Sequence, residues 1–424
     1  MILTHIIANR ISRQTCDELN RESGRHYTNV MKWHWRIYRK QGLWLSQSKA
    51  EKLEDFLGES TILHAHSRDA AQQAFYKACK TAKTLRQKGD PAAKYPHKRK
   101  RYRTTIWKNT GIRKNGRYLL LARARGVEPL AVQLPDHLAE LPGDSFSEAR
   151  LVYNRKTKRY EWHLVVDDGQ EMPAPPGTNI VSVDLGEIHP AVATDLSHAV
   201  IFSVRELRAL YQYRNKQIAG LQEAQSNHKK RSRRWWKLER RKRKLLGFVE
   251  RKTRDILHKI ARSLVAWAVE RQAGVIVIGD VRDINQGKRL NRQSQQKVSQ
   301  WPHGKLRRYI TYKAAMSGIR VELVSEAYST RSCPNCGHQK KRTGRDFHCL
   351  KCGLVAHRDV VGAINIRSIY DFGEVAHYQP PTDVKVSHPF KVHPERCRRV
   401  RSWGGTPEPF VIKTVKLAQL APAG

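Results

Sequence analysis

Four cysteines are grouped in one 20-residue window of the sequence, as two Cys-x-x-Cys pairs. Cys333 and Cys336 form the first pair, and Cys349 and Cys352 form the second after twelve intervening residues. Each pair presents two thiolates on a tight turn, and two such turns supply the four sulfur ligands of a tetrahedral zinc site. Because four protein ligands leave no open position for water or substrate, we predict a structural zinc ribbon rather than a catalytic zinc.

Two aspartates occupy positions that could hold catalytic metal ions. Asp184 ends an apolar strand, and Asp359 follows the cysteine motif at the expected start of a helix. Phosphodiester hydrolysis benefits from two divalent ions about 4 Å apart, and Mg²⁺ takes carboxylate ligands from separate parts of a chain. A single aspartate at a strand end is more often a helix cap, so the interpretation depends on both residues and on the order of elements around them.

The chain is strongly basic. It has 80 Lys and Arg against 38 Asp and Glu, a formal net charge of +42. Such an excess repels itself, so an extended polyanion is the expected partner, with generic basicity of the ribosomal kind as the alternative. The residues that we expect to bind nucleic acid are Lys229, Lys230, Arg231, Arg233, Arg234, Arg240, Arg241, Lys98, Arg99, Arg101 and Arg103. Tyr27 and Trp33 are candidates for stacking on bases, although such aromatics are more often core residues.

The sequence shows neither a secretion signal nor a membrane span. Its first residues lack a basic region and a cleavage site, and no apolar run approaches 18 residues. The other cysteines, Cys16, Cys79 and Cys397, are scattered, as is typical of a reducing compartment. We therefore expect a cytoplasmic protein, associated with nucleic acid (in a bacterium, with the nucleoid), that has no membrane partner and no small-molecule substrate.

Hydrophobic patterning divides the chain into a front half and a back half. The front half has a strand at residues 2–7, a helical region at 14–88 and a β-rich region at 104–166. The proline-rich segment 173–177 is the expected boundary. Beyond it we expect strands at 180–184, 190–194 and 200–204, a long broken helix to 272, a strand at 275–278, a helix at 303–317 and a strand at 319–324. That succession is the order of a ribonuclease-H-like fold.

The sequence resembles the TnpB family, the nucleases carried by insertion sequences. The resemblance rests on residues 95–121, on Val183-Asp184-Leu-Gly186, on the Cys-Pro-Asn-Cys-Gly-His start of the ribbon, and on Arg358-Asp359 through Asn365-Ile366. It extends from the first strand to about residue 369, and the related type V CRISPR effectors share the nuclease core. It implies a guide RNA, a double-stranded target DNA with a short flanking motif, and cleavage by a split RuvC site.

One position departs from the pattern of the family. The second carboxylate of the family is usually a glutamate at the end of the strand that here ends in Gly279 and Asp280. Asp280 should face the other side of the sheet, because neighbouring strand positions alternate. We place the missing carboxylate at Glu326, after the strand at 319–324, since adjacent strands lie about 4.8 Å apart and glycine leaves the space open. A site without nuclease activity and Asp280 as a ligand are the alternatives.

The resemblance and the motifs together define the expected architecture. It is a multidomain α/β protein whose predicted parts are a β-barrel-like wedge domain (1–12 and 94–176), a helical recognition domain (13–93), a ribonuclease-H-like RuvC core with a basic helical insertion (177–326), the zinc ribbon (327–357), the end of the core (358–370) and a flexible tail (371–424). Asp184, Glu326 and Asp359 are the predicted catalytic residues and ligands of two Mg²⁺ ions, leaving a 5′-phosphate on the product. Three functions follow: a guided DNA endonuclease, a guided binder that does not cut, or a transposase acting directly on DNA ends.

Overall fold

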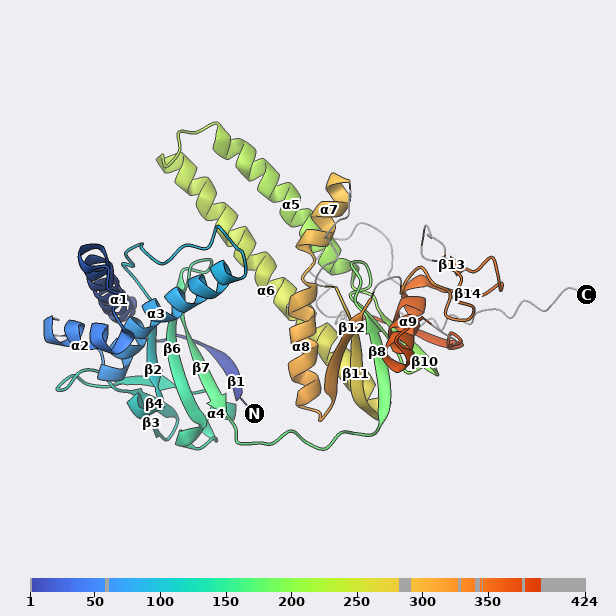
Figure 1. Cartoon of the computed structure of the whole chain (residues 1–424), viewed down its shortest axis with the longest axis horizontal. Coiled ribbons are helices and arrows are strands. Elements are labelled where there is room, and N and C mark those ends of the chain that lie inside the picture. Colours follow the sequence, from blue (N-terminus) through green and yellow to red (C-terminus); the bar gives the residue numbers. More distant parts are fainter. Residues whose placement is uncertain are drawn as a thin grey trace, which may run out of the picture. The chain divides into compact units, whose positions relative to one another are not determined.

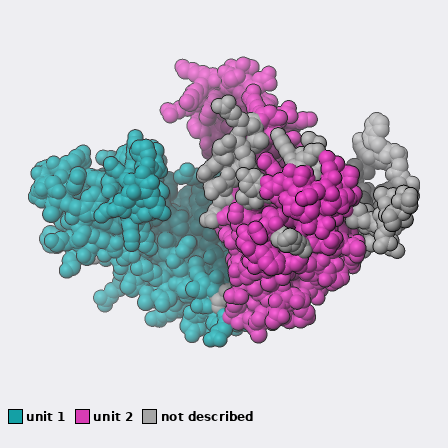
Figure 2. All heavy atoms as spheres, turned by 45° about the vertical axis from the view of Figure 1, so that its right-hand side comes forward, with its two compact units in different colours: residues 1–171 teal, residues 172–424 magenta. Residues whose placement is uncertain are grey.

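The computed structural model describes residues 2–57, 61–281, 291–326, 329–339, 344, 346–375 and 378–389. These residues divide into two compact units, residues 1–171 and 172–424, which Figure 2 colours separately. The proline-rich segment at which the sequence places its boundary begins two residues after the division. Each unit has its own hydrophobic core.

The β-structure of the first unit consists of antiparallel sheets (Figure 1). One sheet has the order β1-β7-β6-β2, so the first strand of the chain pairs with a strand far along the sequence. Its strands are β1 (Ile2–Ala8), β2 (Thr105–Lys108), β6 (Phe146–Asn154) and β7 (Arg159–Asp167). The other sheet is β3 (Ile112–Asn115), β4 (Tyr118–Leu121) and β5 (Leu130–Gln133). Short helical segments at Asn109–Gly111, Asp136–Ala139 (α4) and Gly143–Ser145 connect the strands. Trp107 and Trp162 are fully buried between the sheets.

The helices of the first unit are α1 (Arg13–Gln41), α2 (Gln47–Leu57) and α3 (Ala65–Gln87). Ser12 caps α1 by accepting a hydrogen bond from the backbone N–H of Thr15, and Gly42 ends the helix at φ +66°. Val30 of α1 and Phe75 of α3 are fully buried in the core between the helices. This core is distinct from the one between the sheets, to which α1 contributes Cys16 and Leu19 from its first turns.

The second unit is built on one mixed sheet with the order β12-β11-β8-β9-β10-β15. Its strands are β8 (Asn179–Asp184), β9 (Ala191–Thr194), β10 (His198–Phe202), β11 (Ala273–Asp280), β12 (Arg320–Ser325) and β15 (Asp383–Ser387). Strands β8, β11 and β12 are parallel, whereas β9 is antiparallel to both of its neighbours. The strands and helices expected from residue 180 to residue 324 are therefore present in the expected order.

Helices cover both faces of this sheet (Figure 1). The helices are α5 (Arg205–Ser226), α6 (Arg233–Glu270), α7 (Arg292–Gln300), α8 (His303–Ala315) and α9 (Arg358–Phe372). α6 and α8 pack against Val181, Val183, Ile276 and Ile278 on one face. α9 packs against the other face, where Val192 and Val277 lie. Since strand residues alternate between faces, Ser182, Asp184 and Gly279 belong to the α9 face.

The prediction of a flexible tail from residue 371 is wrong for part of that segment. α9 continues to Phe372, and β15 pairs in parallel with β10 as the edge strand of the sheet. Val384 is buried against residues of β10 and α9. The five-residue alternation of β15 is too short to stand out among prolines and charged residues in the sequence. The remainder of the predicted tail, residues 390–424, lies outside the described residues.

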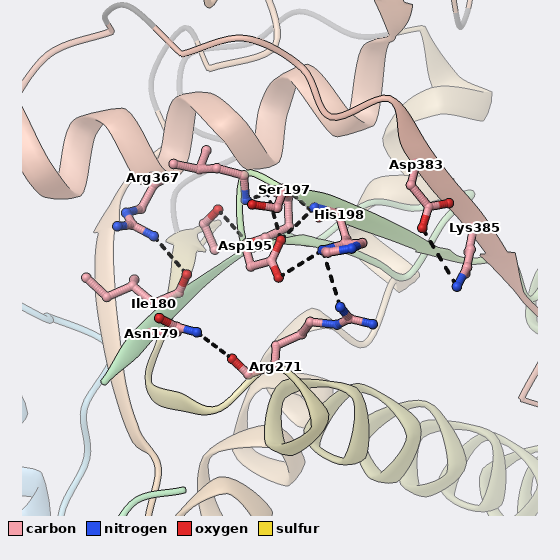
Figure 3. A network of polar contacts seen from close by, with 12 residues as sticks. Asn179, Ile180, Asp195, Ser197, His198, Arg271, Arg367, Asp383 and Lys385 are labelled. Carbon is pink, nitrogen blue, oxygen red and sulfur yellow. Dashed lines mark hydrogen bonds and ion pairs between the residues drawn. The ribbon is translucent and has the colours of Figure 1, made fainter. Parts of the chain in front are cut away.

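A polar network joins elements at the end of the sheet opposite Asp184 (Figure 3). The side-chain amide of Asn179 donates to the carbonyl of Arg271 at 2.9 Å, and the Arg271 guanidinium lies 3.3 Å from Nδ1 of His198. His198 also lies 3.4 Å from Asp195. From α9, Arg367 donates to the carbonyl of Ile180 at 2.8 Å. These contacts fix the start of β8 to α6, to the β9–β10 turn and to α9.

In the described residues, no helix combines the length and the apolar character that crossing a bilayer requires.

We predict that β15 contributes to the stability of the second unit. Val384→Asp places a charge in the buried position between β10 and α9, and should lower the free energy of unfolding by about 2 kcal/mol or more. Lys385→Asp, at the neighbouring exposed position, should change it by less than about 0.5 kcal/mol. Urea unfolding of both variants measures the difference. Equal stability of the two variants would show that β15 does not pack in solution.

Candidate metal centres

Asp184 is placed at the carboxyl end of β8, on the face that α9 covers. It is only 7% exposed. Burial raises its pKa well above the usual range, the negative charges of Asp359 and Glu326 raise it further, and the positive charge of Arg358 opposes them. The structure therefore brings the three carboxylates named from the sequence into one electrostatic neighbourhood, on elements far apart in the chain.

Glu326 lies over Gly279, in the space that a side chain at that position would need. β11 and β12 are parallel, with Gly279 opposite Val324, so Glu326 follows two residues beyond. A Cβ atom added at Gly279 would lie 3.2 Å from Cβ and 3.3 Å from Oε2 of Glu326, and 2.8 Å from Cδ1 of Ile366. The carboxylate of Glu326 thus occupies the end of β11, where the family pattern leads one to expect a glutamate on β11 itself.

Asp280 points the other way. Its carboxylate lies 3.3 Å from the guanidinium of Arg307 in α8, on the face of the sheet opposite to α9. The alternation of side chains along β11 accounts for this direction. The alternative of Asp280 as a ligand beside Asp184 is therefore wrong for this structure.

Asp359 is held in the first turn of α9, which lies close against β8. The Nδ1 atom of His357 caps the helix by accepting from the backbone N–H of Asp359 at 3.3 Å. A Cβ atom at Gly362 would lie 2.9 Å from Oδ2 of Asp184, so glycine is what allows α9 to approach so closely. Asn365 is fully buried and donates to the carbonyls of Ser329 and Ser332 at 2.6 and 2.8 Å. α9 is therefore tied to the segment that enters the cysteine motif.

The histidines beside Asp359 are site residues that the sequence does not predict. One ligand-type atom from each of His189, His357 and Asp359 lies within 4.8 Å of the others. A signal was available, because each histidine lies within five residues of an aspartate that we had already singled out, His189 after Asp184 and His357 before Asp359. Without the fold, however, nothing indicated that they meet.

The four cysteines converge as a zinc ribbon requires. The Sγ atoms of Cys333 and Cys352 are 3.6 Å apart, as are those of Cys336 and Cys349. Four sulfurs arranged tetrahedrally at about 2.3 Å from a zinc ion lie about 3.8 Å from one another, so the spacing fits zinc. Each cysteine pair lies in a turn that a backbone hydrogen bond closes: the N–H of Gly337 donates to the carbonyl of Cys333, and the N–H of Gly353 donates to the carbonyl of Cys349. Both glycines have a positive φ. Beside these turns, β13 (Asp346–His348) pairs with β14 (Val355–His357).

Comparison with known proteins gives a family context to this arrangement. The family model described as "Cas12f1-like, TNB domain" matches residues 303–366, and the one described as "Probable transposase" matches residues 163–285. A TnpB-like protein of Methanocaldococcus jannaschii is 32% identical over 142 residues, covering 32% of this chain and 50% of that protein. The Escherichia coli K12 protein named "Putative RNA-guided DNA endonuclease InsQ" is 29% identical over 224 residues, covering 49% of this chain and 53% of that protein. Over these segments the chain is similar to TnpB-like proteins.

The fold of the chain also resembles that of a solved effector. The cryo-EM structure of a Cas12f1–sgRNA–target DNA complex aligns with a TM-score of 0.56 at 13% identity, covering 84% of this chain and 83% of that one. At this level of identity the similarity shows the fold alone, a multidomain α/β architecture. The chain spans about half the length of the curated relatives it matches.

A basic helical hairpin extends from the sheet of the second unit. It is formed by α5 and α6, which lie side by side and meet at a turn around residues 227–232 (Figure 1). The residues predicted there are all exposed, namely Lys229, Lys230, Arg231, Arg233, Arg234, Arg240 and Arg241. Glu239 is already engaged, because Arg243 donates to it at 3.0 Å and Lys242 lies 3.7 Å away. The positive charge of the hairpin is therefore largely available to a partner.

The first unit carries a second basic surface, and here one prediction needs correction. Lys98, Arg99 and Arg101 are exposed along the segment before β2. That segment helps to line a cavity of about 710 Å³ whose basic residues are Lys32, Arg39, Arg86, Lys94 and Arg99. Tyr27 is not available for base stacking: it is 2% exposed, and Arg103 lies 4.9 Å above its ring. Tyr27 and Arg103 therefore pack against each other and contribute to the protein interior instead of to a nucleic-acid surface. Trp33 is half-buried, and the guanidinium of Arg36 lies beside its ring.

We predict that zinc shields the four ribbon cysteines from alkylation. Iodoacetamide should modify Cys333, Cys336, Cys349 and Cys352 rapidly only after a chelator has removed the metal. Cys16 and Cys79 should stay unmodified in the folded protein, because burial raises the pKa of each thiol to about 11. Peptide mass spectrometry with and without the chelator measures each site separately. Equal alkylation of the ribbon cysteines under both conditions would contradict a bound metal.

Proposed function

We propose that this chain is an RNA-guided DNA endonuclease with a RuvC-like site formed by Asp184, Glu326 and Asp359. The observation that carries the proposal is the position of Glu326, whose Oε2 lies 3.3 Å from where a Cβ would stand on Gly279. A third carboxylate thereby joins Asp184 and Asp359, whose charges act on one another. The names of the relatives, an RNA-guided DNA endonuclease and Cas12f effectors, support the same reaction class.

The three carboxylates suit hard divalent cations. Two Mg²⁺ ions bound there would supply an activated water and stabilise the leaving oxygen during hydrolysis of a phosphodiester, giving a 5′-phosphate. The chain itself holds the carboxylates in place: Asp184 by the end of a buried strand, Asp359 by the first turn of α9, and Glu326 by the end of β12. The raised pKa of Asp184 reflects how unfavourable this cluster is without a compensating cation.

The basic surfaces suit a guide RNA and a double-stranded target DNA. We assign the hairpin of α5 and α6 to the phosphates of the guide or of its duplex with the target, and the exposed residues 97–101 to RNA or to the flanking duplex. In this assignment residues 1–12 and 94–176 form the wedge domain, and 13–93 the recognition domain. The second unit contains the RuvC core and the zinc ribbon, and β15 extends the core to residue 387. The protein would act on DNA in the bacterial cytoplasm.

Two other functions are alternatives to the guided nuclease, and each of them differs from it in one property that can be measured. A guided binder without cleavage would need the carboxylate site to be incomplete, and the position of Glu326 argues against that. A transposase acting directly on DNA ends is favoured by one observation, the family model described as "Probable transposase" over residues 163–285. Specific binding of the RNA-free protein to transposon ends would support that function, whereas binding to matched DNA only with RNA supports the guided nuclease.

We predict that Glu326→Ala abolishes cleavage and keeps target binding. The substrate is a plasmid that matches the co-expressed RNA and carries a randomised flank, with Mg²⁺ present. Losing one of three carboxylates should slow cleavage by at least about 100-fold, because the ligand set for the metals is then incomplete. Glu322→Ala on the same strand is the control, and it should cut like the unmodified complex.

A second variant tests whether the position of the oxygen atoms matters more than the strand that supplies them. Gly279→Glu added to Glu326→Ala returns a carboxylate to the end of β11, in space that the alanine has vacated. We expect part of the cleavage rate to return, limited by the nearby Cδ1 atom of Ile366. If the unmodified complex binds its target tightly but never cuts, the protein works by occupancy and the nuclease proposal is wrong.

We predict that the hairpin binds phosphates. Replacing Lys229, Lys230 and Arg231 with Glu should weaken RNA binding by about tenfold or more and lower the slope of log affinity against log salt by roughly two. Arg155 and Lys156 in the β6–β7 turn and Arg159 at the start of β7 are exposed, and together they provide a control with the same change of charge. Filter binding at several salt concentrations measures both quantities. An equal loss in both triple variants would mean that net charge, and not the hairpin, determines affinity.

A further inference from the structure

Two histidines and an aspartate meet beside the carboxylate cluster. His189, His357 and Asp359 each offer one ligand-type atom, and these atoms lie within 4.8 Å of one another. All three side chains are half-buried. They come from separate elements: the loop between β8 and β9, the end of β14 and the first turn of α9. Imidazole nitrogens combined with a carboxylate oxygen are a donor set that first-row transition metals prefer.

The backbone fixes the position of His189. The chain turns sharply after β8, and the N–H of Gly186 donates to the carbonyl of His189 at 3.1 Å. A Cβ atom at Gly186 would lie 2.8 Å from that carbonyl oxygen, so the turn as it stands requires glycine. The turn brings the ring of His189 to 5.4 Å from the ring of His357, measured between centroids, at an interplanar angle of 70°. His189 therefore faces its partner because of a defined turn.

The structure of α9 fixes the other two residues. Nδ1 of His357 accepts from the N–H of Asp359 at 3.3 Å, a long contact that holds the ring beside the first turn of the helix. A metal ion bound at this nitrogen would replace that contact. Asp359 lies in the same turn, so its carboxylate and the imidazole are positioned by one helix end. Three protein ligands would also leave positions open for water, as in zinc enzymes with three protein ligands.

We propose that His189, His357 and Asp359 form a second divalent-metal site, which takes a transition-metal ion of the Mn²⁺ to Zn²⁺ series in preference to Mg²⁺. Mg²⁺ favours oxygen ligands alone, whereas imidazole raises the affinity for the later metals of the series. The site shares Asp359 with the proposed nuclease centre, so an ion bound here alters the charge and orientation of that carboxylate. Binding does not require that the chain cuts DNA.

The test uses the full chain with zinc in the cysteine site and with neither RNA nor DNA. Co²⁺ is the probe, because its visible absorption reports nitrogen and oxygen ligands, whereas cysteine ligands add a sulfur-to-metal charge-transfer band in the near ultraviolet. We expect saturable visible bands without that charge-transfer band. His189→Gln and His357→Gln should each weaken Co²⁺ binding by at least about tenfold, the low end of the loss seen even for outer partners of ligands. Glutamine at 357 also keeps an acceptor for the helix cap.

Matched variants make the result decisive. His198→Gln removes a histidine that faces Asp195 at the other end of the sheet, and should leave Co²⁺ affinity unchanged (Figure 3). Retained zinc content and an unchanged unfolding temperature show that each variant is folded. The proposal is overturned if Co²⁺ gives only the sulfur band, if both glutamine variants bind as the unmodified chain does, or if Glu326→Ala weakens binding as strongly as they do. Because no nucleic acid is present, a failure of the nuclease proposal would leave these spectra unaffected.

Discussion

The carboxyl group of Asp184 is confined to a buried position, and much of the second unit is arranged around that constraint. Burial and the charges of Asp359 and Glu326 all raise the pKa of its carboxyl group. Three carboxylates in so small a space repel one another, and the interior of a protein offers little water to screen them. A sheet with helices on both faces is rigid enough to hold such an arrangement, because β8 cannot move without displacing the residues packed on either side.

Two glycines create the space in which the carboxylates meet. Gly362 allows α9 to approach β8, since a Cβ atom there would lie 2.9 Å from Oδ2 of Asp184. Gly279 leaves the end of β11 open, and Glu326 of the next segment occupies that opening. What a metal ion requires is oxygen atoms at suitable positions, and adjacent parallel strands end close enough for either of them to supply one. The loss of a carboxylate from one strand and its gain on the neighbouring one are therefore compatible with the same ligand geometry.

The sequence predicts those features that depend on local pattern and on strand geometry. The cysteine spacing, the order of strands from residue 180 and the opposite directions of Gly279 and Asp280 follow from motif chemistry and from the alternation of side chains. Features that depend on distant packing could not be predicted. β15 is a short alternation that becomes a strand only because β10 offers a free edge, and Tyr27 is buried only because α3 lies over α1. The ring of His189 lies beside that of His357 because of the turn after β8, and the direction of that turn cannot be predicted from the sequence.

α9 connects the cysteine ribbon to the carboxylates, so a zinc ion bound by the four cysteines would influence the proposed chemistry indirectly. The helix begins directly after β14 of the ribbon and carries Asp359 in its first turn. Its buried Asn365 binds the carbonyls of Ser329 and Ser332, which lie on the path from β12 into the first cysteine pair. Val361 of the same helix packs with Phe347 and with the buried cysteines. Without a metal in the ribbon, we would expect the start of α9 to lose part of the packing that sets its position, and Asp359 to move away from Asp184. A metal that touches no substrate can thus still determine whether the carboxylates converge.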